Sequence, residues 1–136
     1  MALEYDKVLK AININYCVIG RGKRSAKYFS SVSGTKVFVG GLSKFLISKP
    51  TIASRAIVAV NIEELKSTCI KLIKYGVKDI LLEKPGGINA KEIKQLYNYT
   101  KNKKVNIRIA YNRRYYSSVR RVKQLLKNDG GVQSFN

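Results

Sequence analysis

The sequence contains no histidine and only two cysteines, Cys17 and Cys69. Zinc sites draw on histidine and cysteine, and disulfide scaffolds need several cysteines, so both classes are disfavoured. No apolar run reaches the roughly 18 residues that a membrane span requires. The first ten residues, MALEYDKVLK, also lack the basic-then-apolar order of a secretory signal. We therefore expect a cytoplasmic protein with no metal and no membrane partner.

Acidic residues are scarce as well. Eight aspartates and glutamates stand against 27 lysines and arginines, a formal net charge of +19. Such an excess favours anionic partners: nucleotides, phosphates, nucleic acid or acidic lipid. Weak, non-specific nucleic-acid binding that falls with salt follows from charge alone. Because the basic residues are spread along the chain, a drift in composition without a functional target is an open alternative.

The order of apolar segments predicts the fold class. With 136 residues, the chain has the length of one domain. Strand-like apolar runs lie at 14–19, 36–39, 56–60, 79–82 and 105–110. Helical patterns separate them, which predicts an α/β fold: a Rossmann-like parallel sheet of about five or six strands, with helices on both faces in three layers. The expected order of strands in the sheet is 2-1-3-4-5.

Helix signals are strongest in the middle of the chain. Residues 62–75 repeat apolar side chains at helical spacing, and Gly76 fits the cap that follows. Asn89 and Glu92 predict a capping box for the next helix. Weaker helical patterns cover residues 1–13, 20–31, 42–48 and 117–127. We assign 1–130 to one nucleotide-binding domain, and expect 131–136 to begin a strand of a substrate domain that this chain lacks.

A glycine motif follows the first strand. It reads Gly20-Arg21-Gly22-Lys23-Arg24-Ser25 and opens a helical segment, where a dinucleotide fingerprint belongs. Gly20 permits the tight turn, and Gly22 lets a pyrophosphate approach the backbone. The helix N–H groups and the three basic side chains then suit the phosphates. A purely structural turn is the alternative reading.

The end of the second strand bears on the choice of cofactor. An acidic residue there would hold the ribose 2′-hydroxyl of NAD, but the sequence has Gly40-Gly41-Leu42-Ser43-Lys44 instead. Ser43 and Lys44 suit the 2′-phosphate of NADP, so NADP is favoured over NAD. Lys44 as a solvated surface lysine is equally compatible with the pattern.

The sharpest signal is Glu83-Lys84-Pro85, which follows the fourth strand directly. In open α/β folds, ligands bind at the carboxyl ends of the strands. Lys84 is a candidate proton donor or hydroxyl-orienting group there. Pro85 fixes the backbone and is a candidate for a cis peptide. The alternative is an ordinary exit from the strand.

With these motifs the chain resembles the N-terminal domain of the Gfo/Idh/MocA oxidoreductases. The resemblance rests on Val18–Gly22, Ala56–Val60, Ile80–Pro85 and Tyr111–Arg114. It implies that Lys84 lies beside the nicotinamide and the substrate hydroxyl, and that Glu83 contacts the cofactor side. It also places Asn61, Pro85, Asn112 and Arg113 near the cofactor. The implied activity is hydride exchange between NAD(P) and a sugar, polyol or related hydroxyl or carbonyl compound.

Three features depart from that family. Asn61, rather than a Thr-Pro turn, follows the third strand, and the acidic ribose contact is absent. Above all, we expect the chain to lack the family's second domain, which forms the substrate face and usually supplies a catalytic histidine or another acid-base group. We expect an incomplete catalyst that pairs with a copy of itself or with a separate subunit carrying the substrate domain. The alternatives are a basic α/β module that binds nucleic acid through its Tyr- and Arg-rich segment, and a non-catalytic remnant acting through a partner chain.

Overall fold

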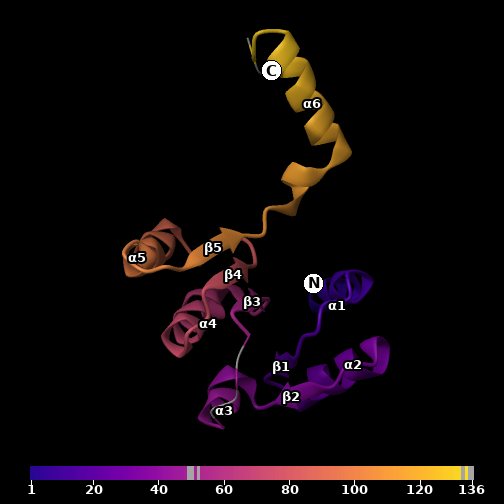
Figure 1. Cartoon of the computed structure of the whole chain (residues 1–136), viewed down its shortest axis with the longest axis vertical. Coiled ribbons are helices and arrows are strands. Elements are labelled where there is room, and N and C mark those ends of the chain that lie inside the picture. Colours follow the sequence, from indigo (N-terminus) through magenta and orange to yellow (C-terminus); the bar gives the residue numbers. More distant parts are fainter. Residues whose placement is uncertain (49–50, 52, 133, 135–136) are drawn as a thin grey trace.

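The chain folds as an alternating series of helices and strands (Figure 1). The structure, a computed structural model, describes residues 1–48, 51, 53–132 and 134. In chain order the elements are α1 (Ala2–Ala11), β1 (Val18–Gly20), α2 (Lys23–Ser33), β2 (Val37–Val39), α3 (Gly41–Ile47), β3 (Arg55–Val58), α4 (Ile62–Tyr75), β4 (Asp79–Leu82), α5 (Ala90–Thr100), β5 (Asn106–Ile109), the short 3-10 helix η1 (Asn112–Tyr115) and α6 (Ser117–Asn128). This alternation confirms the α/β class.

The strands of the described chain form two parallel sheets rather than the single sheet that we expected. β1 pairs with β2, while β3, β4 and β5 form the second sheet in that order. The pairings 2-1 and 3-4-5 are as predicted, but within the described residues no ladder joins β1 to β3. The strands have only three or four residues each, so a sheet edge offers few backbone groups for a further ladder.

The hydrophobic core belongs to the three-stranded sheet and the helices α4 and α5. Its buried members are Val58, Leu65, Cys69, Leu72, Ile73, Val77, Ile80, Leu82 and Leu96. Burial raises the pKa of the Cys69 thiol to about 12, so this cysteine is an inert core residue at neutral pH. In the other half, only Ala26 and Phe29 of α2 are buried apolar side chains among the residues described.

Local signals placed α4 and α5 correctly. α4 runs from Ile62 to Tyr75 as predicted, and Gly76 ends it with a φ of 110°, a backbone conformation that favours glycine. At the start of α5, the Asn89 side chain accepts a hydrogen bond from the Glu92 N–H at 3.0 Å. The Glu92 carboxylate accepts one from the Ile88 N–H at 2.9 Å, one residue before the expected partner.

The first predicted strand needs correction. The run 14–19 indicated a strand buried on both faces, but β1 begins only at Val18, and Ile14 and Cys17 are exposed. The residues before Val18 lie beyond the β2 ladder and adjoin α1, so no second strand covers them. The strand expected at 132–136 is not formed at Val132 or Ser134, and its other positions lie outside the described residues.

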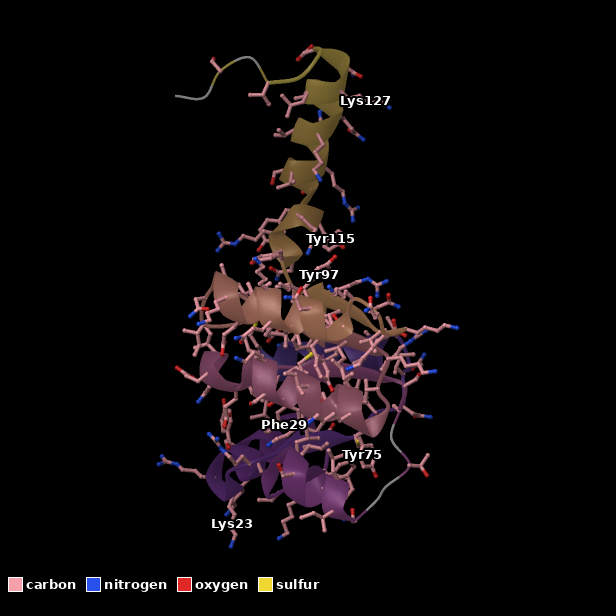
Figure 2. All side chains as sticks on the ribbon, turned by 90° about the vertical axis from the view of Figure 1, so that its left-hand side faces the viewer. Lys23, Phe29, Tyr75, Tyr97, Tyr115 and Lys127 are labelled. Carbon is pink, nitrogen blue, oxygen red and sulfur yellow. The ribbon has the colours of Figure 1, made fainter. Side chains whose placement is uncertain are left out.

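The C-terminal helix projects away from both sheets (Figures 1 and 2). None of its residues is buried, although Val119, Val122, Leu125 and Leu126 give it an apolar side. Figure 2 shows Tyr115 near the base of this arm and Lys127 near its far end. No helix in the described part of the chain is long and apolar enough to cross a membrane.

Candidate nucleotide-binding site

The glycine motif forms the turn between β1 and α2, as predicted. Gly20 ends β1, and a Cβ atom there would lie 2.9 Å from Val37 Cγ1 on β2, so a side chain would push the paired strands apart. Gly22 is the N-cap of α2, in extended backbone. The first intrahelical bond runs from the Ala26 N–H to the Gly22 carbonyl, which leaves the N–H groups of residues 23–25 at the helix start.

The first turn of α2 favours an anion. It contains no acidic residue, and Lys23 and Arg24 are both exposed. Two cations at the positive end of a helix dipole are unfavourable unless an anion offsets them. Ser25 does not cap the helix, because its hydroxyl donates to the Gly22 carbonyl at 3.1 Å. The turn therefore combines unpaired N–H groups with positive charge, as a phosphate site requires.

A second pair of glycines adjoins this turn. Gly40 and Gly41 follow β2 with φ values of 114° and 79°, a conformation that side chains rarely adopt. The Gly40 N–H donates to the Gly20 carbonyl at 3.0 Å. A Cβ on Gly41 would lie 3.8 Å from the Arg21 side chain. The glycine backbone after β2 thus lies beside Arg21 of the first turn, without a side chain that would keep a ligand away from it.

Ser43 and Lys44 lie in the helix that follows these glycines. The Lys44 stem folds over Gly40, because a Cβ built on that glycine would lie 2.5 Å from Lys44 Cδ. The Ser43 hydroxyl accepts a hydrogen bond from Lys71 Nζ of α4 at 2.9 Å, and its own proton remains available to donate. Lys71 is therefore a further cation beside the proposed 2′-phosphate position. Sequence reasoning missed it, because it lies 28 residues from Ser43 and has no motif of its own.

Arg21 connects the glycine turn to the third strand's exit. Its guanidinium forms an ion pair with Glu64 in the first turn of α4, and both side chains are partly exposed. Asn61 is the N-cap of that helix, and its carbonyl accepts from the Glu64 N–H at 2.9 Å. The Asn61 side chain is exposed and forms no cap hydrogen bond, so its amide is open to solvent at the start of α4.

Glu83 lies at the carboxyl end of β4 with both carboxylate oxygens engaged. Oε1 accepts the Tyr5 hydroxyl of α1 at 2.6 Å, and Oε2 accepts the Lys84 N–H at 3.1 Å. Only 7% of Glu83 is exposed. Burial and the bond to Glu83 raise the pKa of Tyr5, so its phenol stays a proton donor well above neutral pH. No sequence signal indicated that α1 reaches this residue.

Lys84 and Pro85 follow in a tight turn. Lys84 is exposed, and the Lys84–Pro85 peptide is cis, as anticipated. The Gly86 N–H donates to the Glu83 carbonyl at 3.0 Å. Gly86 has a φ of 93°, and a Cβ there would lie 2.6 Å from Ile109 Cδ1 of β5. The backbone that presents Lys84 is therefore packed directly against the neighbouring strand.

The segment after β5 forms η1 beside that turn. The Ala110 N–H donates to the Leu82 carbonyl at 2.9 Å, which places the exits of β4 and β5 side by side. Arg114 donates to the carbonyls of Ile109 and Tyr111 and stacks on the rings of Tyr111 and Tyr115. Asn112 and Arg113 are exposed. Arg114 thus organises the segment, and Asn112 and Arg113 are left for a ligand.

The predicted residues therefore form two groups at strand ends. The glycine-turn group comprises residues 20–25 and 40–44, with Lys71 added by the structure. The strand-exit group comprises Asn61, Glu83–Pro85 and Asn112–Arg113. Arg21 of the first group forms an ion pair with Glu64 in the first turn of α4, the helix whose N-cap is Asn61 of the second group. Within the described residues, no set of three or more His, Cys, Asp or Glu side chains is placed to hold a metal ion.

Comparisons with known proteins identify the fold. No family model and no curated protein sequence matches the chain. The WlbA dehydrogenase from Chromobacterium violaceum, solved with NADH and UDP-GlcNAcA, is 14% identical with a TM-score of 0.79 over 94% of this chain and 37% of its own. GenD2 from gentamicin A biosynthesis, solved with NAD, is 19% identical with a TM-score of 0.80 over 97% and 37%. A myo-inositol 2-dehydrogenase from Lactobacillus plantarum is 16% identical with a TM-score of 0.71 over 86% and 34%.

At such low identity, the likeness establishes the fold, which is Rossmann-like. An inositol dehydrogenase, one of the enzymes after which the resembled family is named, is among these structures. The resemblance inferred from the motifs is thereby confirmed at the level of the fold. The chain spans only about a third of the length of these structures, between 34% and 37%.

Proposed function

We propose that the chain is the nucleotide-binding part of an NAD(P)-dependent oxidoreductase that acts on a sugar, a polyol or a related hydroxyl or carbonyl compound. The observation that carries the proposal is the glycine-turn group. Two close-packed glycine turns meet beside a helix start that carries Lys23 and Arg24 and no acid. Similar folds solved with NADH or NAD support a dinucleotide as the ligand.

Calorimetric titration of the purified chain with NADH and NADPH tests this proposal. The matched variants are Gly22→Val, whose side chain would fill the approach to the helix start, and Gly34→Ala. Gly34 lies at the far end of α2, where a Cβ would meet nothing within 4 Å but would sit at a φ of 70°, so this variant controls for glycine strain without blocking the helix start. We expect binding in the wild type and in Gly34→Ala, and loss in Gly22→Val. Equal binding by all three, or none by the wild type, overturns the proposal.

NADP is the proposed cofactor, because Lys44 and Lys71 flank Ser43 where an acidic ribose contact is absent. A 2′-phosphate held by one lysine is worth on the order of 1–3 kcal/mol. Lys44→Ala should therefore weaken NADPH binding and leave NADH binding unchanged. Lys36→Ala, which removes an exposed lysine before β2, is the control. Equal wild-type affinity for the two cofactors argues against this preference.

We assign Lys84 the role of proton donor or hydroxyl-orienting group, because it is exposed at a strand exit beside the end of β5. Hydride transfer also needs the substrate carbon to be held near the nicotinamide, and an open sheet edge provides one side of a cleft. We therefore expect turnover of polyols or nucleotide sugars only with a second domain or subunit. Turnover by the chain alone, followed by nicotinamide absorbance, would contradict this expectation.

Where a partner completes the activity, Lys84→Ala should abolish it. Lys78→Ala is the matched control, because Lys78 is exposed just before the opposite end of β4. A second copy or a separate subunit is the proposed partner. Full activity in Lys84→Ala would remove this residue from the mechanism.

A second candidate function is nucleic-acid binding by the C-terminal third. Between Ile93 and Asn128 there are eleven lysines and arginines and no acidic residue. Tyr111, Tyr115 and Tyr116 are exposed in the same stretch. Arginines with exposed rings suit single-stranded nucleic acid.

Polarisation of a labelled oligonucleotide at several salt concentrations tests this second function. Replacing Arg120 and Arg121 together by Gln should flatten the salt dependence more than replacing Lys27 and Lys36. Equal effects of the two pairs would indicate attraction by net charge alone.

A further inference from the structure

Two adjacent residues of α1 reach opposite halves of the molecule. Tyr5 donates its hydroxyl to Glu83 Oε1 at 2.6 Å, at the exit of the three-stranded sheet. The next residue, Asp6, is 4% exposed and accepts the hydroxyls of Tyr16 and Thr35, which precede β1 and β2. α1 is thus hydrogen-bonded to the three-stranded half through the Tyr5 phenol and to the two-stranded half through the Asp6 carboxylate.

These contacts add to the apolar packing between the halves, where Leu42 of α3 lies against the core of the three-stranded half. Within the described residues, no backbone ladder joins β1 to β3. Two further polar links between the halves lie on the surface: Arg21 pairs with Glu64, and Lys71 bonds to Ser43. Exposed ion pairs contribute little to fixing a geometry. The Tyr5 and Asp6 contacts are part-buried, and buried hydrogen bonds fix geometry better.

We propose that Tyr5 is a positioning residue: through Glu83 it sets the backbone that carries Lys84, at a fixed distance from the glycine-turn group. This inference rests on the proposed function. Glu83 Oε2 accepts the Lys84 N–H at 3.1 Å, so the hydrogen bonds run from the Tyr5 hydroxyl through the carboxylate to the Lys84 backbone. Asp6 anchors the same turn of α1 to Tyr16 and Thr35, just before the starts of β1 and β2, and the glycine-turn group follows these same three-residue strands.

The proposal predicts which part of a dinucleotide is affected. ADP-ribose offers its pyrophosphate to the glycine turn and lacks the nicotinamide. NADH extends to the strand exits as well. Removing only the Tyr5 hydroxyl should therefore weaken NADH binding by about five- to tenfold, the effect of one hydrogen bond, and leave ADP-ribose binding within about twofold.

The experiment titrates wild type, Tyr5→Phe and Tyr28→Phe with both NADH and ADP-ribose. Tyr28 lies on α2 and is 63% exposed, so it controls for loss of a phenol elsewhere. Selective loss of NADH affinity in Tyr5→Phe supports the proposal. An unchanged NADH affinity overturns it, and so does an equal loss for both ligands, which indicates a merely structural role. If the wild type binds NADPH alone, the same comparison is made with NADPH and 2′-phospho-ADP-ribose. If it binds neither NADH nor NADPH, the proposed function itself fails and this inference falls with it.

Hydrogen exchange of the unliganded protein supplies a second measurement. Tyr5→Phe should speed amide exchange in residues 83–87 and leave α4 unchanged. Faster exchange throughout α4 would show that the substitution loosens the fold as a whole, and would count against a positioning role. Protection unchanged at 83–87 would equally overturn it.

Discussion

The two sheets of this protein are built by different means. The three-stranded sheet buries Val58, Ile80 and Leu82 against α4 and α5, within a continuous apolar cluster. The two-stranded sheet has no buried strand residue; its half buries Ala26 and Phe29 of α2, together with Asp6, which accepts the hydroxyls of Tyr16 and Thr35. Its strand ends instead carry the glycines that leave backbone open. The apolar core therefore lies in one half, whereas the candidate site residues lie at strand ends of both halves.

The largest expected effect comes from the core of the three-stranded half. Leu65→Ala, at a residue only 1% exposed, should lower the free energy of unfolding by about 2–5 kcal/mol. The same substitution at Leu46, which is half-buried on α3, should cost about 1 kcal/mol. Urea unfolding of both variants checks this. Equal losses would show that the halves are equally packed.

A second comparison uses glycines that follow strands in each half. Gly86→Ala and Gly40→Ala both place a side chain at positive φ, a strain of about 1–2 kcal/mol. At Gly86 the Cβ meets Ile109 of β5, whereas at Gly40 it meets the flexible Lys44 stem. Gly86→Ala should therefore cost about 1–3 kcal/mol more in thermal unfolding. The reverse order would place the tighter turn in the two-stranded half.

The helix starts also differ between the halves, because α5 in the three-stranded half has a side-chain cap and α2 in the two-stranded half does not. Asn89 caps α5 through the Glu92 N–H, so Asn89→Ala should cost about 1 kcal/mol of stability. Ser25 near the start of α2 donates to a carbonyl and caps no N–H. Ser25→Ala should stay within about 0.5 kcal/mol of the wild type. A large loss at Ser25, measured by denaturant unfolding, would mean that α2 is capped after all.

The smallest expected effect is a loss of stability at acid pH, and it concerns Asp6 in the two-stranded half. The Tyr16 hydrogen bond, assisted by Lys10 and Thr35, lowers the pKa of Asp6 below its ordinary value of 3.8. A lowered folded pKa means that the stabilisation is complete above the unfolded value and disappears as pH falls through the folded one.

Thermal melts between about pH 2 and pH 6 should therefore show a smaller acid loss in Asp6→Asn than in the wild type. Asp129→Asn, at an exposed residue beyond α6, is the control. The idea fails if Asp6→Asn and the wild type lose stability in parallel.

Local chemistry made much of this structure predictable. Apolar spacing and Gly76 gave α4 its observed bounds, and Asn89 with Glu92 gave the start of α5. These signals act within a few residues, so tertiary context does not alter them. The alternation of strands and helices likewise gave the α/β class, and the glycines and Glu83-Lys84-Pro85 fell at strand ends as expected.

The misplaced parts depend on distant neighbours. Ile14 to Cys17 are apolar and β-prone, but a strand forms only where a partner strand is present. The split into two sheets depends on whether β1 and β3 meet. Lys71 and Tyr5 join the site from 28 and 78 residues away, respectively, and neither belongs to a motif.

By itself, the sequence determined the kinds of elements, their order, the turns that require glycine, and the positive charge available to an anion. These follow from backbone sterics, side-chain periodicity and charge, which are properties of short segments. Only the tertiary structure decided which strands pair, that the core lies in one half, and that Tyr5 and Asp6 of α1 hold both halves. Such contacts close long loops, and many pairings compete at similar energy until the whole chain packs.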